Sequence, residues 1–215
     1  TTFVILRVLK TRIMHSLHNI ASYILNKYPG EITPMKLQKL LYYVKVWTLV
    51  ADKKMIKSSD AFFAWKHGPV NPSIYHQYKG YKNNPIEDTP SYLPFTDDEK
   101  EVVDFVLDSY GFYNAITLSK ATHAEDPWIN KKEVSGRITD QDILDYYTHE
   151  SFAKNFPLNK THGYYPPNTI SHYAFVFDMD KTDKAAEVMF DSIEEYKNLF
   201  SKASEDYKFL VNQIY

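Results

Sequence analysis

The sequence contains no cysteine, only six glycines and no long apolar run, and each shortage excludes a class of protein. Without cysteine the 215-residue chain cannot hold a disulfide framework, a Cys-type zinc site or a thiol nucleophile. No segment approaches the roughly 18 apolar residues of a membrane-spanning helix. The few glycines form no phosphate-binding loop, so we expect no cofactor. A lack of cysteine fits a reducing compartment, and we expect a cytoplasmic protein.

What remains is an ordinary globular composition, with 44% hydrophobic, 16% aromatic and 24% charged residues. The net charge of −2 argues against a general nucleic-acid binder. Residues 1–57 carry ten basic and two acidic groups, a net +8, so the remainder carries −10. This asymmetry suggests that the two parts attract each other or that each faces a charged partner. Solvated helix faces of opposite sign are the alternative interpretation.

The pattern of apolar residues predicts a mainly α protein: a compact helical domain with at most a small two- or three-stranded β element, plus a long C-terminal helix. Cap residues followed by proline mark helix starts at Thr33, Asn71 and Asp126. Thr96 and Glu99 form a capping box for a helix that ends at Gly111. Helices are expected over 16–28, 34–50, 72–79, 96–110, 114–122 and 139–154. The run 66–72 is predicted as a loop, and the strand-like runs 61–65 and 173–177 could pair.

The chain divides into three parts by pattern. Residues 1–13 form an N-terminal extension that we interpret as non-native, because Met14 is typical of a natural start. Residues 14–155 form the helical domain. Residues 156–215 form a C-terminal extension with a heptad-spaced helix.

Apolar residues in the last segment follow a heptad spacing of alternating four and three positions. No proline or glycine occurs from Lys181 to Tyr215, and a continuous helix there would be roughly 50 Å long. One interpretation is a docking or dimer seam, which would make a homodimer possible. The other is a stripe packed on its own domain. The seam residues are Met189, Ile193, Tyr196, Phe200, Tyr207, Leu210 and Ile214, with Ala203 between them.

Few residues suggest chemistry. His67, His123 and Asp126 could supply an acid–base pair for a hydrolase, although backbone hydrogen bonding at a helix junction is the simpler interpretation. We expect no metal site, because His15 and His18 alone are not a ligand set. Lysines interleaved with aromatics at 36–47 could form a nucleic-acid surface, but one short helix is a small footprint for one.

Three stretches together resemble one family. They are ITPMKLQKLLYYVKVW (Ile32–Trp47), FFAWKHGPVNPSIYHQY (Phe62–Tyr78), and LSKATHAEDPWINK (Leu118–Lys131) followed by ITDQDILDYY (Ile138–Tyr147). Their order and spacing resemble the Panacea domain, whose members include SocA-type antitoxins and phage-associated GepA-like proteins. The resemblance covers about residues 16–150.

The resemblance implies a mostly helical antitoxin domain that neutralises a protein toxin by binding it. The SocA type instead acts as an adaptor that delivers its toxin to a bacterial protease. No catalytic residue or cofactor is established for the family. The motif positions are Lys36, Leu37, Gln38, Lys39, Leu40, Tyr42, Tyr43, Trp65, Gly68, Pro69, Val70, Tyr75, His123, Pro127 and Trp128. Val44-Lys45 replaces the Ala-Gln that often follows the paired tyrosines, which adds charge to that face.

The leading hypothesis is therefore a non-enzymatic antitoxin whose partner is a cognate toxin, encoded by an adjacent gene. Its candidate partner-binding residues are Lys36, Gln38, Lys39, Tyr43, Trp47, Trp65, His67, Gly68, Pro69, Tyr75, His123 and Trp128. A proteolytic adaptor, a hydrolase and a DNA-binding repressor are the alternatives. The adaptor would need a protease as a second partner. We expect no membrane partner, and nucleic acid is disfavoured.

Overall fold

The computed structural model describes residues 14–158, 163–169 and 189–214. For residues 206–214 it describes the backbone only. Within these ranges the protein is mainly helical with a small three-stranded antiparallel sheet, which confirms the predicted fold class. The α-helices are α1 (Leu17–Lys27), α2 (Pro34–Val50), α3 (Pro72–Tyr78), α4 (Asp97–Tyr110), α5 (Ala115–His123), α6 (Asp126–Ile129), α7 (Asp140–Tyr147) and α8 (Ile193–Ile214). The strands are β1 (Phe62–Trp65), β2 (Gly68–Val70) and β3 (Arg137–Ile138), and the 3₁₀ helices are η1 (Lys79–Tyr81), η2 (Lys132–Val134) and η3 (Ser151–Asn155).

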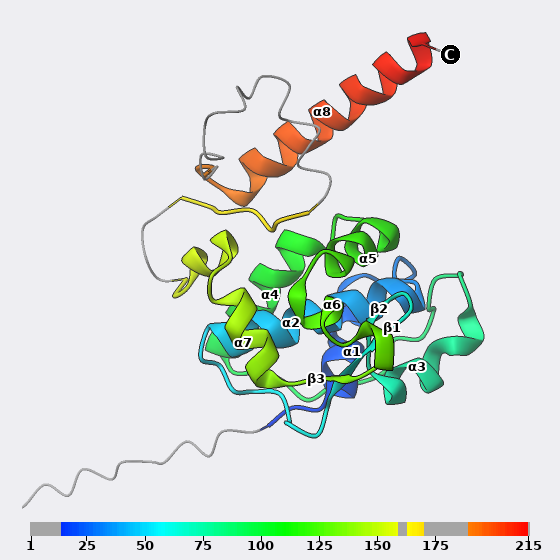
Figure 1. The fold of residues 1–215 in the computed structure, drawn as a ribbon, viewed down its shortest axis with the longest axis vertical. Coiled ribbons are helices and arrows are strands. Elements are labelled where there is room, and N and C mark those ends of the chain that lie inside the picture. Colours follow the sequence, from blue (N-terminus) through cyan, green and yellow to red (C-terminus); the bar gives the residue numbers. More distant parts are fainter. Residues whose placement is uncertain (1–13, 159–162, 170–188, 215) are drawn as a thin grey trace, which may run out of the picture.

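Helix α2 is the centre of the fold. It contacts α1, α3, α4, α5, α7 and β2, and Figure 1 shows it surrounded by these elements. Every residue from Leu37 to Thr48 is buried, so the helix buries all its faces rather than one stripe. Thr33 caps it by accepting a hydrogen bond from the Lys36 amide, and Pro34 occupies the first turn. The start at Thr33-Pro34 is as predicted.

An aromatic core packs around the second half of α2. Trp47 lies against Phe152 with ring centroids 4.6 Å apart, and its indole N–H donates to the Tyr110 hydroxyl at 2.8 Å. Tyr43 stacks on Tyr110 at 4.1 Å. Buried tyrosines and tryptophans need such hydrogen-bond partners, and here they find them in one another.

The sheet has the order β2-β1-β3, with both pairs antiparallel. Trp65 faces Gly68 across a two-residue turn, so the predicted loop over 66–72 is wrong where β2 lies. A three-residue strand that contains glycine and proline carries too little β propensity to be recognised. The other predicted strand, 173–177, lies outside the described residues.

Several helix ends differ from prediction for local reasons. The caps at Asn71 and Thr96 are confirmed, but Glu125 rather than Asp126 precedes α6. Helix α7 begins after Thr139 as predicted and ends at Tyr147 instead of continuing to 154. Tighter hydrogen bonds from the His149 and Glu150 amides to carbonyls three residues back end the helix. The chain then turns Phe152 into the core.

Ion pairs join the basic N-terminal part to the acidic remainder. Lys27 pairs with Asp104 at 2.8 Å and with Asp108 at 3.0 Å, both on α4. Lys45 is buried and pairs with Asp140 at 2.9 Å. The positive charge that Lys45 adds, at the position where the resembling sequences often have glutamine, is therefore neutralised within the fold. The interpretation that the two parts attract each other is confirmed for these lysines.

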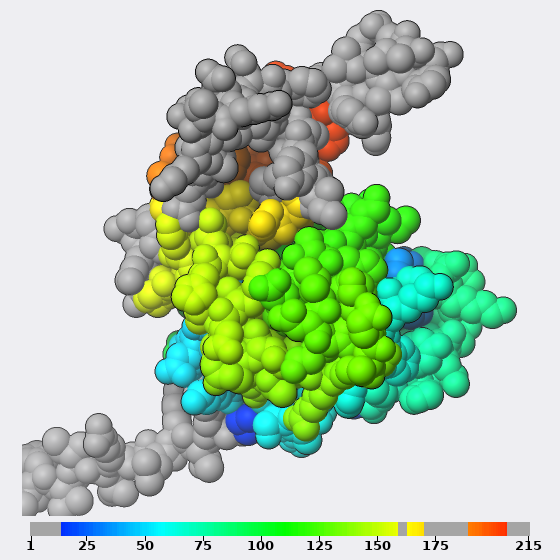
Figure 2. Space-filling view, viewed as in Figure 1, coloured from blue at the N-terminus to red at the C-terminus, as the bar shows by residue number. Residues whose placement is uncertain are grey.

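The C-terminal part rests on the helical domain. Residues 163–169 lie against the helical domain, as the yellow atoms beside the green surface show in Figure 2. Tyr164 is part of the hydrophobic core. Helix α8 begins at Ile193, with the Ser192 hydroxyl capping the Glu195 amide. Met189 therefore precedes the helix, and its predicted place on the helical seam is wrong. At 1.5 Å per residue α8 spans about 33 Å rather than 50 Å. A domain boundary near residue 155 stays a prediction.

Within the described ranges, no helix has the length and apolar content needed to cross a membrane.

Candidate functional site

The three sequence blocks meet at one place in the fold, where α2, the β1–β2 hairpin and the α5–α6 junction are in contact. Their polar side chains form a buried centre that we call the polar centre, made of Gln38, Lys39, Tyr43, Asn71 and Glu125. Such a group is stable only if its members satisfy each other, because an unpaired buried polar atom costs about 1–3 kcal/mol.

Lys39 connects α2 to the hairpin. Its side chain is 1% exposed, and its ammonium donates to the Pro69 carbonyl at 3.0 Å. Burial lowers the pKa of Lys39 to about 7, and the negative charge of Glu125 opposes that shift. Gly68 makes the approach possible, because a Cβ there would lie 2.5 Å from the Lys39 Nζ and from the Thr122 Oγ1. Gly68 also has a φ of +96°, which favours glycine.

Glu125 connects the α5–α6 junction to α2 and α7. The Tyr43 hydroxyl donates to its carboxylate at 2.9 Å, and the Tyr147 hydroxyl donates to the other oxygen. Burial raises the pKa of Glu125 to about 7, although both tyrosines and the charge of Lys39 oppose the rise. Burial thus shifts the pKa of the lysine down and the pKa of the glutamate up, and the charge of each opposes the shift of the other.

Gln38 and Asn71 complete the polar centre. The Gln38 side chain donates to the Asn71 carbonyl at 3.1 Å and accepts from the Asn71 amide at 2.8 Å. Asn71 also donates to the Ala61 carbonyl at 2.8 Å and caps α3 at the Ile74 amide. One asparagine therefore fixes the hairpin, α2 and α3 relative to one another.

Aromatic side chains fix the outer edge of the hairpin. The Trp128 indole donates to the Trp65 carbonyl at 2.8 Å, and the His123 ring stacks on Trp128 at 4.1 Å. Burial and the charges of Lys39 and His67 lower the pKa of His123. Its buried Nε2 has no hydrogen-bond partner among the described residues.

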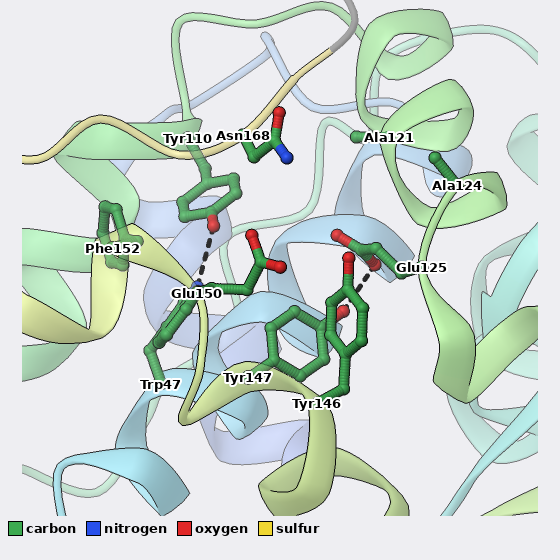
Figure 3. Close-up of a pocket in the computed structure, with 10 residues that line it drawn as sticks. All are labelled: Trp47, Tyr110, Ala121, Ala124, Glu125, Tyr146, Tyr147, Glu150, Phe152 and Asn168. Carbon is green, nitrogen blue, oxygen red and sulfur yellow. Dashed lines mark hydrogen bonds between the residues drawn. The ribbon is translucent and has the colours of Figure 1, made fainter. Parts of the chain in front are cut away.

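A small cavity of about 100 Å³ adjoins Glu125 on its far side. Figure 3 shows the side chains of Glu125, Glu150 and Asn168 converging on it, beside the rings of Trp47 and Tyr110. Burial raises the pKa of Glu150, and hydrogen bonds with Tyr146 and Asn168 oppose that rise. The cavity has room for water-sized groups, which would hydrate the polar centre.

An open groove of about 360 Å³ lies on the outer side of the polar centre. We call it the basic groove. It is lined by Pro34, Met35, Gln38, Lys39, Trp65, Lys66, His67, Val70, Tyr75, Lys79, Lys82 and Asn83. Figure 1 shows α3 beside β1 and β2, the elements that form its walls with the start of α2. Apolar and aromatic side chains that lie beside several cationic groups are suited to binding a protein segment.

The stretch that forms this arrangement is similar to a known protein family. The family model described as "Antitoxin SocA-like, Panacea domain" matches residues 37–129. This stretch matches the Panacea domain. The matched stretch runs from the first turn of α2 to the end of α6, so it includes the residues that form the polar centre. No curated protein and no solved structure matches the chain.

The Panacea match indicates a general role for the protein. A SocA-like antitoxin domain suggests an antitoxin role, and an antitoxin implies a cognate toxin as partner. The domain family is antitoxin-like and generally non-enzymatic.

The predicted partner-binding residues of the Panacea domain fall into two groups. The buried residues, which build the fold at this place, are Gln38, Lys39, Tyr43, Trp47, Gly68, Pro69 and Trp128. Lys36, Trp65 and His123 are half-buried, whereas His67 and Tyr75 are exposed. Five of these residues line the basic groove: Gln38, Lys39, Trp65, His67 and Tyr75. Their contact with a partner stays a prediction.

The acid–base candidates are only partly brought together. His67 and His123 are close enough for their charges to interact, but Asp126 is exposed at the start of α6. No hydrogen bond joins Asp126 to either histidine within the described part of the chain. The described part of the chain also contains no group of three or more histidine, aspartate or glutamate side chains that could hold a metal ion.

The first half of the C-terminal seam faces the protein's own core. Tyr196 is 1% exposed, and its hydroxyl shares a hydrogen bond with that of Tyr113. Phe200 lies 5.3 Å from the Tyr113 ring and 5.5 Å from the Phe112 ring, while Ile193 is half-buried. Met189 is 52% exposed. Tyr207, Leu210 and Ile214 lie on α8, but their side chains fall outside the description.

Sequence reasoning missed the members of the site that come from outside the recognised motif positions. Lys66, Lys79 and Lys82 line the groove. Asn71 and Glu125 belong to the polar centre, and the Tyr147 hydroxyl donates to Glu125. Lys66 stands directly before the His67-Gly68-Pro69 motif, which could have drawn attention to it. Lys79 and Lys82 are separated from Lys66 by α3, and only the fold shows that they share a surface.

Proposed function

We propose that this protein is an antitoxin that neutralises a cognate protein toxin by binding it directly. The observation that carries the proposal is the Panacea match over residues 37–129, within which side chains from the three sequence blocks are hydrogen-bonded to one another. The buried members of the site fix its shape, and the exposed members offer an open groove to a partner. Binding and occlusion need no reacting group on the antitoxin itself.

The charge distribution supports a protein partner. Several lysines of the N-terminal part are neutralised within the fold by aspartates, so they do not contribute a broad basic surface. Among the described residues, the lysines that stay unpaired at the site are confined to the basic groove, where they lie beside aromatic side chains. Nucleic-acid binding depends on many phosphate contacts along a backbone, whereas a protein interface can depend on a few anchors.

Co-expression with the product of the adjacent gene tests this function. We expect the neighbouring protein alone to stop growth, and co-expression of this protein to restore it. The two purified proteins should then elute as one complex in gel filtration. Failure of co-expression to restore growth would contradict an antitoxin role for this gene pair.

The adaptor mechanism is separated by the toxin half-life. Direct neutralisation predicts an unchanged half-life and full rescue in cells that lack the relevant protease. Rescue that needs the protease, together with faster toxin turnover, would instead show delivery for degradation.

A further inference from the structure

The basic groove has a rigid wall on each side. Trp65 ends β1, where its carbonyl accepts from Trp128, and its ring meets Tyr75 of α3 edge to face at 5.2 Å. The opposite wall is the first turn of α2, which Gln38 bonds to Asn71. Because buried hydrogen bonds hold both walls, a partner would meet a surface that is already shaped and would lose little free energy to ordering it.

The floor and walls offer an apolar anchor site. Met35 and Trp65 are half-buried, and the Tyr75 side chain is 40% exposed although it is a large aromatic. Large aromatic side chains in a groove are typical of residues that dominate binding energy in protein interfaces. Together they present an apolar surface on which an aliphatic or aromatic side chain of a partner can pack.

The rim carries positive charge without compensation. Lys66, Lys79 and Lys82 are exposed, and no ion pair is found for any of them within the described residues. None of the residues that line the groove is aspartate or glutamate. In a chain whose net charge is −2, this is a local basic patch, and it favours a negatively charged partner surface.

We propose that the basic groove binds an acidic segment of the toxin, with toxin carboxylates facing the three lysines and an apolar toxin side chain seated against Trp65 and Tyr75. This inference rests on the proposed function, since it names the surface through which the toxin is held. The buried Lys39 then has a positioning role, because its bond to Pro69 holds the hairpin wall in place.

A pair of charge-reversal variants tests the groove. The first is Lys66→Glu with Lys79→Glu and Lys82→Glu. The matched control is Lys54→Glu with Lys57→Glu and Lys202→Glu, which reverses three exposed lysines outside the groove and changes the net charge equally. Kd for the purified toxin is measured by calorimetry. We expect the groove variant to bind about 100-fold more weakly, and the control to change by less than about threefold.

A second variant and a second probe complete the test. Tyr75→Ala, at an exposed position, should weaken toxin binding at least tenfold while the melting temperature stays within a few degrees of the parent. A 20-nucleotide single strand serves as the nucleic-acid probe. If the groove variants bind toxin normally, or if they lose only the oligonucleotide, the groove inference is wrong. In that case the unmodified protein would still restore growth and form a complex with the toxin. The groove inference can therefore fail while the proposed function holds.

Discussion

The hydroxyl of Tyr43 donates a hydrogen bond of 2.9 Å to the carboxylate of Glu125, which lies 82 positions further along the chain. This bond joins the first and third of the sequence blocks that resemble the Panacea domain. Lys39, one helical turn before Tyr43, binds the second block through Pro69. Residues of the three blocks are therefore partners of one another, and much of their sequence encodes the shape of the site rather than its outer surface.

Removing the Glu125 charge should change how stability depends on pH. The pKa of this carboxyl is raised to about 7 in the fold from an ordinary 4.5, so the folded state holds a proton that the unfolded chain releases between these values. The contribution of Glu125 to the free energy of unfolding is thus greatest below pH 4.5. It falls by on the order of 3 kcal/mol as the pH rises to about 7. Glu125→Gln should lack this fall.

Urea unfolding at pH 5 and pH 7.5 measures the difference directly. The parent should lose more stability than Glu125→Gln over that interval. Equal losses in the two proteins would mean that Glu125 titrates in the fold much as it does in water.

Gly68→Ala should destabilise the domain by about 2–4 kcal/mol. The new Cβ would meet the Lys39 ammonium and the Thr122 hydroxyl, and the residue would hold a left-handed φ. Gly80→Ala is the matched control, because a Cβ there meets nothing within 4 Å. We expect the control to be neutral or slightly stabilising in chemical denaturation. Similar losses for both glycines would argue against the close approach of Lys39.

Asn71→Ala should cost more than the loss of an ordinary helix cap. Asn71 caps α3 and also donates to the Ala61 carbonyl from a buried position. Asn114 caps α5 at an exposed position through one hydrogen bond to the Thr117 amide. We expect about 1 kcal/mol for Asn114→Ala and about 2–3 kcal/mol for Asn71→Ala in thermal or urea unfolding. A cost at Asn71 no larger than at Asn114 would contradict its proposed part in the polar centre.

Tyr196→Ala should destabilise the whole domain by about 3 kcal/mol, because its buried ring packs on Phe190 and Tyr164. Leu199→Ala, at an exposed position on the same helix, should change stability by less than about 0.5 kcal/mol. The melting temperature should not depend on protein concentration if this part of the seam packs within one chain. A strong concentration dependence, lost in Tyr196→Ala, would indicate a dimer seam instead.

Local signals in the sequence predicted most of the helices, because caps act over three or four residues. Thr33-Pro34, Asn71-Pro72 and the Thr96–Glu99 box mark starts that the structure places at the same residues. The failures are of two kinds. Strand β2 is too short for a periodic signal, and α7 ends because tertiary packing draws Phe152 inward.

The site was harder to predict because its pairs are distant in sequence. Lysine is rarely buried, and nothing local indicates that Lys39 lies in the interior opposite Glu125. The motif pointed to the right region but did not separate residues that shape the site from residues that reach its surface. The lysines of the basic groove come together only through the turn after Trp65 and the length of α3.

Direct binding is tested most simply by titrating the purified toxin from the adjacent gene into the unmodified protein in a calorimeter. The account predicts a saturable complex with a Kd below about 1 μM, which corresponds to roughly 8 kcal/mol. An absence of measurable heat and of a shared gel-filtration peak, in a pair where co-expression restores growth, would contradict it.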